Sequence, residues 1–221
     1  MLIVEELHLL LTRPDGRVES AASVHRLFAE IAAVIVDLAL HERVLVTEER
    51  SPAVQVISTE LTGNPVLDAS LARLTPLSGK RLQSLLMRGT LDPLSDVVDS
   101  LVAQGVLARG ERGFFGGQRT PEVDPGPEML VRSRLAAVIA GAAAPSQADL
   151  TLLAILQGLN AAHTILRNES GGASAVQLKK QIEQLVAGSA AGDAVSKAVN
   201  TAIAAAMMAA MTPVIIATTS G

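Results

Sequence analysis

Few side chains in this sequence could carry chemistry, and they are scattered along it. The four histidines are His8, His25, His41 and His163, and none belongs to an H-E-x-x-H or similar zinc-binding spacing. The chain has no cysteine, which excludes disulfides, thiolate catalysis and cysteine-based zinc or iron–sulfur sites. We therefore predict no metal site and no cofactor.

Motifs for nucleophiles and nucleotides are missing as well. The sequence contains no G-x-S-x-G elbow, no G-x-x-x-x-G-K-[ST] loop and no G-x-G-x-x-G after a strand. Neighbouring carboxylates occur at Glu5-Glu6 and Glu48-Glu49, but adjacent side chains point in different directions on a helix or strand. We expect solvated faces or helix ends there rather than acid/base pairs, and an enzyme is the least favoured interpretation.

A basic stretch stands out in a chain whose formal net charge is −4. Between Asp68 and Asp92 there is no acidic residue. The basic residues of this stretch are Arg73, Lys80, Arg81 and Arg88. Such a local patch suits an anionic headgroup, whereas the chain lacks the clustered basic face that nucleic acid requires.

A glycine-rich segment from Arg109 to Arg119 holds two of the three aromatic residues, Phe114 and Phe115. Glycines flank both rings, and the segment also contains Arg112. A phenylalanine pair among arginines suits either an anionic membrane interface or a contact with a second subunit. The alternative is a tip that folds back onto its own core.

A mostly helical chain must position these features. Apolar residues make up 49% of it and aromatic residues 1%, which favours close-packed helices over a β-sandwich. From hydrophobic periodicity, with Asp149 as an N-cap and Gly105 in the C-cap role, we predict helices and shorter helical pieces. The helices cover 1–12, 23–40, 93–104, 129–140, 149–167, 175–186 and 193–211, and the shorter pieces cover 68–74 and 82–87.

Two β-hairpins are predicted in addition, one pairing 44–47 with 54–57 and one running from Val106 through the glycine-rich tip to Val123. A helix precedes each hairpin. The length of 221 residues predicts one mainly α domain spanning 1–221.

The two ends of the chain bear on its location. The apolar start carries Glu5 and Glu6 where a signal peptide would carry positive charge, so we expect a first helix and a cytoplasmic protein. Residues 198–221 contain no charge, but alanines and polar residues dilute them and Pro213 interrupts them. A span needs about 20 consecutive apolar residues, so we expect a buried core helix there rather than a tail anchor.

Five motifs follow one another between about residues 3 and 167. They are Glu5-Glu6-Leu7-His8-Leu9-Leu10-Leu11 with Asp15-Gly16, Asp37-Leu38-Ala39-Leu40-His41-Glu42-Arg43-Val44, Thr62-Gly63-Asn64-Pro65-Val66-Leu67-Asp68, Leu101-Val102-Ala103-Gln104-Gly105-Val106-Leu107, and Asp149 with Leu152-Leu153-Ala154-Ile155-Leu156. Their order resembles that of the Golgi phosphoprotein 3 family. Its members are peripheral Golgi membrane proteins that bind phosphatidylinositol 4-phosphate, and it has bacterial relatives, which this chain resembles.

The resemblance implies a central helical bundle surrounded by amphipathic helices, with hairpins at the periphery. It also implies a non-enzymatic adaptor that binds a lipid headgroup and holds membrane enzymes by their cytosolic tails. The family's headgroup pocket uses a Trp and basic residues, and the corresponding positions here are Ala22, Ile31, Leu91 and Leu94. Because none of them can bind a phosphate, the pocket is not carried over. The family's Phe-rich hairpin, used for self-association and membrane contact, is similar to the tip around Gly113 to Gly117.

The leading hypothesis is a cytoplasmic adaptor, peripheral at the inner face of a membrane. It would touch anionic lipid or a phosphoinositide through Arg109, Arg112, Phe114, Phe115 and Arg119, helped by Lys80, Arg81 and Arg88, with a membrane protein as its client. The alternative is a homo-oligomeric interaction module that uses the same hairpin without lipid. Nucleic-acid binding through the repeated helix and hairpin is disfavoured by the negative net charge.

Overall fold

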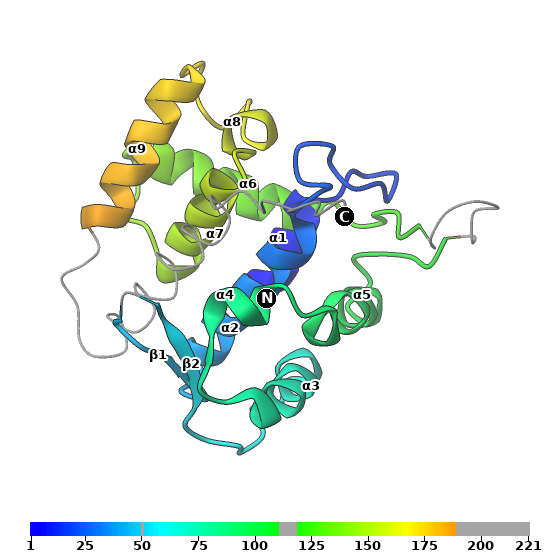
Figure 1. Ribbon diagram of the computed structural model, residues 1–221. Coiled ribbons are helices and arrows are strands. Elements are labelled where there is room, and N and C mark those ends of the chain that lie inside the picture. Colours follow the sequence, from blue (N-terminus) through cyan, green and yellow to red (C-terminus); the bar gives the residue numbers. More distant parts are fainter. Residues whose placement is uncertain (50, 111–118, 189–221) are drawn as a thin grey trace, which may run out of the picture.

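The computed structural model describes residues 1–49, 51–110 and 119–188. The chain is mainly α, as predicted, with a small antiparallel sheet at its edge (Figure 1). The helices of the described part are α1 Ile3–Leu10, α2 Arg26–Leu40, α3 Pro65–Leu74, α4 Leu82–Leu86, α5 Leu94–Ala103, α6 Gly126–Ile139, α7 Gln147–Gly158, α8 Ala162–Ile165 and α9 Ala175–Gly188. The predicted helix 193–211 and the uncharged segment 198–221 lie outside the described residues.

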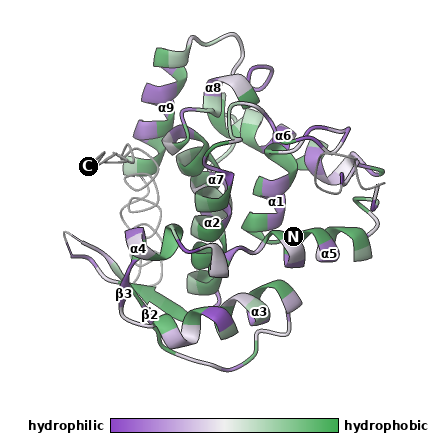
Figure 2. Ribbon diagram, turned by 45° about the vertical axis from the view of Figure 1, so that its right-hand side comes forward, coloured by the Kyte–Doolittle hydropathy of each residue, from purple (hydrophilic) through white to green (hydrophobic). Residues whose placement is uncertain are grey.

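Helices α1 and α2 form the centre of the protein. Every residue of α1 is buried, and α2 is buried from Ala29 to Ala39. The two helices pack against each other. Helix α1 is also covered by α5, α6 and α7. Helix α2 is covered by α3, α4 and α7. Hydrophobic residues accordingly dominate the middle of the ribbon (Figure 2). Burial of each leucine or isoleucine side chain there stabilises the fold by about 1.5–3 kcal/mol.

Local sequence signals set several helix boundaries. The Asn64 side chain accepts hydrogen bonds from the N–H groups of Val66, at 2.9 Å, and Leu67, and so begins α3, with Pro65 in the first turn. At the end of α5, Gly105 has φ +75° and the Val106 N–H donates to the Leu101 carbonyl at 2.9 Å. Gly105 therefore ends this helix, as predicted.

The predicted helix 149–167 is wrong in two respects. The N-cap of α7 is Ser146, and Asp149 is the third helical residue of a capping box with it. The helix then stops at Gly158, because Asn160 adopts a left-handed φ of 55° and the Ala161 N–H donates to the Leu156 carbonyl at 2.9 Å. Asn160 thus adopts the left-handed conformation that glycine usually adopts just after the end of a helix. His163 consequently lies in the separate helix α8, off the buried stripe of α7.

The first predicted hairpin is confirmed. Strands β1 Val44–Val46 and β2 Ala53–Val56 pair antiparallel with Val44 opposite Val56. A third strand, β3 Lys80–Arg81, was not predicted and pairs with β2, placing Ala53 opposite Arg81. The sheet thus draws part of the basic stretch to the edge of the protein.

Candidate membrane-contact surface

The base of the second hairpin is an antiparallel pair of segments that projects from the helices (Figure 1). Leu107 bridges Glu122, and the Ala108 N–H donates to the Pro121 carbonyl at 2.9 Å. The Gly110 N–H donates to the Arg119 carbonyl at the same distance of 2.9 Å. The tip residues Arg112, Phe114 and Phe115 lie outside the described residues, so their orientation stays a prediction.

The arginines at the two ends of this base differ in their partners. Arg109 forms an ion pair with Asp99 of α5. Arg119 is exposed and has no ion-pair partner among the residues that the structure describes. Arg119 therefore carries the more available charge, while Arg109 fastens the hairpin base to α5.

A loop near the N-terminus braces the other side of the hairpin base. Its Arg13-Pro14-Asp15-Gly16 segment forms a turn, with the Gly16 N–H donating to the Arg13 carbonyl at 2.8 Å. The Pro14 carbonyl accepts the Glu122 N–H at 3.0 Å. Gly16 has φ +77°, and a Cβ atom there would lie 2.7 Å from the Thr120 backbone nitrogen. Only glycine allows this loop to approach the hairpin so closely.

The predicted basic patch separates into one bound and three available cations. Arg73 is paired with Asp96 of α5 by an ion pair of 2.6 Å. Lys80 and Arg81 are exposed on β3, and Arg88 is exposed after α4. Within the described ranges, no carboxylate lies at ion-pair distance from these three side chains. We call Lys80, Arg81 and Arg88 the basic edge.

Arg81 and Arg88 flank the short helix α4. Arg81 is the N-cap residue of α4, and Arg88 lies two residues after the last residue of this helix. The buried face of α4 consists of Leu82, Leu85 and Leu86, and Met87, next to Arg88, is 57% exposed. The sequence signal for this edge was the acid-free stretch itself.

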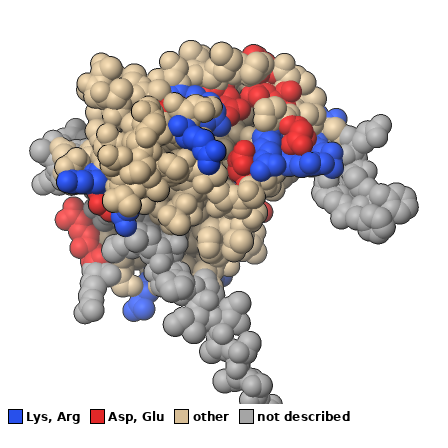
Figure 3. Space-filling model, turned by 90° about the horizontal axis from the view of Figure 1, so that it is seen from above, with Lys and Arg blue, Asp and Glu red and all other residues tan. Residues whose placement is uncertain are grey.

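Most other basic side chains are held by acids. Arg13 pairs with Glu19, Arg17 with Asp15, and Arg132 with both Glu128 and Glu169. In the view of Figure 3, Lys and Arg lie next to Asp and Glu in several places, on a surface formed mostly by other residues. The basic edge differs because three cations without an ion-pair partner among the described residues lie within residues 80–88.

The positions that the resemblance assigns to the headgroup pocket are apolar, and three of the four are buried. Ala22, Ile31 and Leu91 are 1%, 0% and 5% exposed, and Leu94 is 36% exposed. An aliphatic side chain offers a phosphate neither charge nor a hydrogen-bond donor. Core packing thus fills the place where a phosphate site would need guanidinium groups.

Sequence reasoning missed a network of buried acids around α1. Glu5 and Glu6, expected on a solvated face or helix end, are only 1% and 7% exposed, which corrects the expectation of solvation. Glu48 and Glu49 are exposed, as predicted. The buried pair follows from the central place of α1, and hydrogen bonds satisfy each carboxylate.

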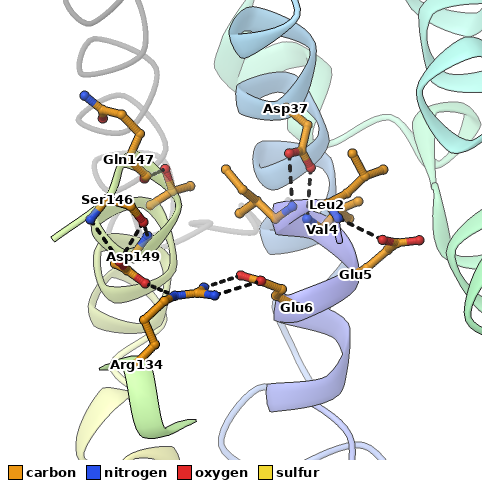
Figure 4. Close-up of polar contacts among 11 residues, drawn as sticks. Leu2, Val4, Glu5, Glu6, Asp37, Arg134, Ser146, Gln147 and Asp149 are labelled. Carbon is orange, nitrogen blue, oxygen red and sulfur yellow. Dashed lines mark hydrogen bonds and ion pairs between the residues drawn. The ribbon is translucent and has the colours of Figure 1, made fainter. Parts of the chain in front are cut away.

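Two carboxylates cap the N-terminus of α1. Asp37 on α2 accepts the Ile3 and Val4 N–H groups, each at 3.0 Å, and Glu5 accepts the Leu2 N–H at 2.8 Å (Figure 4). The other oxygen of Glu5 accepts the Ser100 hydroxyl at 2.6 Å. Burial raises the pKa of Asp37 to about 7, although the two N–H donors act in the opposite direction.

Arg134 on α6 joins α1 to α7. It binds Glu6 through two guanidinium nitrogens, at 2.6 and 3.2 Å, and its Nε donates to Asp149 (Figure 4). The hydrogen bond to Glu6 is the main reason why the pKa of Arg134 is raised. Asp149 in turn accepts the Ser146 N–H at 2.9 Å. Glu6, Arg134 and Asp149 thus link α1, α6 and α7.

A second buried group links α1 to the start of α2. His8 Nδ1 lies 3.2 Å from Glu30, and Arg26 Nε donates to the same carboxylate at 2.8 Å. Burial would raise the pKa of Glu30, but the hydrogen bond with His8 and the charge of Arg26 outweigh it and lower the pKa. No cluster of three or more potential metal ligands occurs in the part of the chain that the structure covers.

Two cavities in the described part flank α9. One, of about 360 Å³, is lined by residues that include His163 and Lys179, and a second, of about 530 Å³, by residues that include Lys180 and Gly171. Separately, none of the helices between residues 1 and 188 has the length and hydropathy of a membrane span.

Comparison with known proteins gives one family match. A family model of Golgi phosphoprotein 3 (GPP34) matches residues 3–206 of the chain. No curated protein gives a significant match. The match covers all of α1 to α9, including the capped central helix and the hairpin base. The chain therefore belongs to the Golgi phosphoprotein 3 (GPP34) family.

Proposed function

We propose that this protein is a non-enzymatic adaptor that contacts an anionic membrane surface through the basic edge and the second hairpin. The observation that carries the proposal is the basic edge: Lys80, Arg81 and Arg88 are exposed and unpaired within the described residues. Membership of the family and the predicted Phe114 and Phe115 contact support it. A membrane protein held beside the lipid would be the client.

The apolar residues at the pocket positions bear on which lipid headgroups the protein can distinguish. With Ala22, Ile31 and Leu91 buried, no guanidinium projects from these positions toward a single phosphate. Attraction then depends on surface charge density and falls with added salt. We infer that the protein senses anionic lipid in general, without preference for a monophosphorylated inositide.

Sedimentation with phosphatidylglycerol vesicles tests the basic edge. Replacement of Arg81 and Arg88 by glutamine should weaken binding about 30-fold, from about 1 kcal/mol per basic residue near the surface. The matched control replaces Arg13 and Arg17, which change the net charge equally but are paired with acids. Equal weakening in both variants would show that net charge matters and that the basic edge does not.

A vesicle panel tests the lipid class. Vesicles with phosphatidylinositol 4-phosphate and vesicles with phosphatidylglycerol, matched in surface charge, should bind the protein equally. A clear preference for the inositide would refute the inference from the filled pocket.

The hairpin needs a separate variant, Phe114→Ser with Phe115→Ser. This change should reduce vesicle binding while the circular dichroism spectrum stays the same. The double variant could instead dissociate an oligomer that light scattering detects in the parent protein. If the parent also does not bind vesicles, the hairpin is a subunit contact and the membrane proposal is wrong.

A further inference from the structure

The joint between the hairpin base and α6 contains an unbalanced group of acids. Glu122 belongs to the hairpin base, where it bridges Leu107, and one of its carboxylate oxygens is buried without a hydrogen-bond partner. Its side chain faces Glu128, in the first turn of α6, which is 8% exposed. Two carboxyl groups thus meet where the hairpin leaves the helices.

The neighbouring cation, Arg132, already binds two acids. Arg132 donates to Glu128 at 2.7 Å and to Glu169 at 3.1 Å, and it also donates to the Ile165 carbonyl. One guanidinium therefore serves two carboxylates, and Glu122 has no cation of its own among the described residues.

Other charged groups near the joint do not remedy the imbalance. Asp124, two residues on, adds a further negative charge. The charged groups of the bracing loop are paired, Arg13 with Glu19 and Arg17 with Asp15, and Arg109 on the opposite segment is paired with Asp99. Burial and the adjacent Glu128 together raise the pKa of Glu122 to about 7.

We propose that this joint is a proton-sensitive attachment: protonated Glu122 donates to Glu128 and holds the hairpin base against α6, and loss of the proton loosens it. The loosening is driven by repulsion between two partly buried carboxylates that share no free cation. Its effect on membrane contact rests on the proposed function, but the attachment itself does not.

The direction of the pH dependence follows from linkage. When the hairpin base separates from α6, Glu122 regains its ordinary pKa of 4.5, below its value in the joint. Between these two values the attached state binds more protons than the separated state. Attachment therefore weakens as pH rises from about 4.5 to about 7, by up to about tenfold per pH unit, and changes little above that.

Hydrogen exchange of the full chain tests the attachment. After correction for intrinsic exchange, protection of the Ala108 and Val123 amides should fall as pH rises from 5 to 7 and level off by pH 8. Glu122→Gln should remove this fall, because the amide can donate to Glu128 at any pH. The matched control, Glu19→Gln, should retain it. A fall of the same size in Glu122→Gln would overturn the proposal, as would constant protection in the parent.

Vesicle binding separates this proposal from the proposed function. If protection changes with pH in the parent but not in Glu122→Gln, while neither protein binds vesicles, the attachment is real and the membrane role is wrong. If vesicles bind but the amide protection does not depend on pH, the membrane role stands and the attachment is refuted.

Discussion

Asp37 is a deeply buried acid that has no ion-pair partner within the described residues. It is 2% exposed and accepts two backbone N–H groups of α1, at 3.0 Å each. These groups would otherwise be unsatisfied, as the first N–H groups of any helix are. The carboxylate thus stabilises the entry of the central helix into the core, although its ionisation is costly there.

Asp37→Asn tests this role. The asparagine oxygen can accept one N–H, but its NH2 group would face the other, so unfolding free energy should fall by about 1–3 kcal/mol. Between pH 3.8 and about 7 the native state holds the Asp37 proton more tightly than the unfolded state, so its contribution to stability decreases as pH rises. The difference between parent and variant should therefore shrink from pH 5 to pH 8.

Urea unfolding of both proteins measures this difference. The chain has no Trp and no Tyr, so circular dichroism is the suitable signal. Glu48→Gln, at an exposed position, is the control and should change stability little at either pH. A difference that grows with pH would contradict the assignment.

Arg134 is the cation that serves two buried acids, Glu6 and Asp149. Its side chain is 37% exposed, but those of Glu6 and Asp149 are 9% and 2% exposed, so Arg134→Met leaves two buried acids without their cation. The cost of breaking a fully buried pair is reduced here by solvent at the guanidinium, and we expect about 2 kcal/mol. Arg13→Met removes an exposed partner of Glu19 and should cost less than about 1 kcal/mol. Equal losses of thermal stability in the two variants would argue against a special role for Arg134.

Buried acids were the part of the structure least accessible from sequence. Glu5 and Glu6 carry the same composition signal as Glu48 and Glu49, yet only the first pair is buried. The difference arises because α1 is surrounded by α2, α5, α6 and α7, and their side chains supply partners up to 128 residues away in the chain. Periodicity within a window cannot report such partners.

The bracing loop is the element whose geometry depends most on one residue. Gly16 combines a left-handed φ of 77° with a close approach to the Thr120 backbone. Gly16→Ala should therefore cost both the strain of the left-handed region, about 1 kcal/mol, and displacement of the hairpin base. Gly63→Ala, at φ +82° with open space around it, adds only the strain.

The comparison of the two alanine variants isolates the contact with the hairpin. Exchange at the Ala108 and Gly110 amides should speed up in Gly16→Ala and stay at the parent rate in Gly63→Ala. The same acceleration in both variants would mean that the loop does not brace the hairpin.

Element-level predictions succeeded where the signals were local. Gly105 ended α5 and the 44–57 hairpin formed, because turn and cap residues act within a few positions. The prediction of one long helix over 149–167 was wrong because Asn160 adopts a left-handed conformation. From sequence alone, this conformation is expected mainly at glycine. Strand β3 was missed because two residues, Lys80–Arg81, show no periodicity and pair with β2 only through the tertiary fold.

At the scale of the whole molecule, local charge opposes overall charge. The net charge is −4, which repels an anionic surface at long range, while the basic edge attracts it at contact. Screening over about 10 Å at 0.1 M salt limits both effects to nearby groups. The placement of a charge should therefore matter more than the total.

Two substitutions that each remove the charge of one acid test whether the placement of a charge matters more than the total. Sheet register places Arg81 opposite Ala53, so Glu48, in the turn between β1 and β2, lies at the same end of the sheet as Arg81. Glu183 lies on α9, which packs against α6, α7 and α8. Glu48→Gln and Glu183→Gln each change the net charge from −4 to −3, by removal of one acid.

Only Glu48→Gln should strengthen sedimentation with phosphatidylglycerol vesicles, by up to about fivefold at low salt, because a charge near the membrane contributes about 1 kcal/mol. The gain should disappear at 1 M salt, where the screening length falls to about 3 Å. If Glu183→Gln strengthens binding as much, attraction follows total charge, and the basic edge does not orient the protein on the membrane.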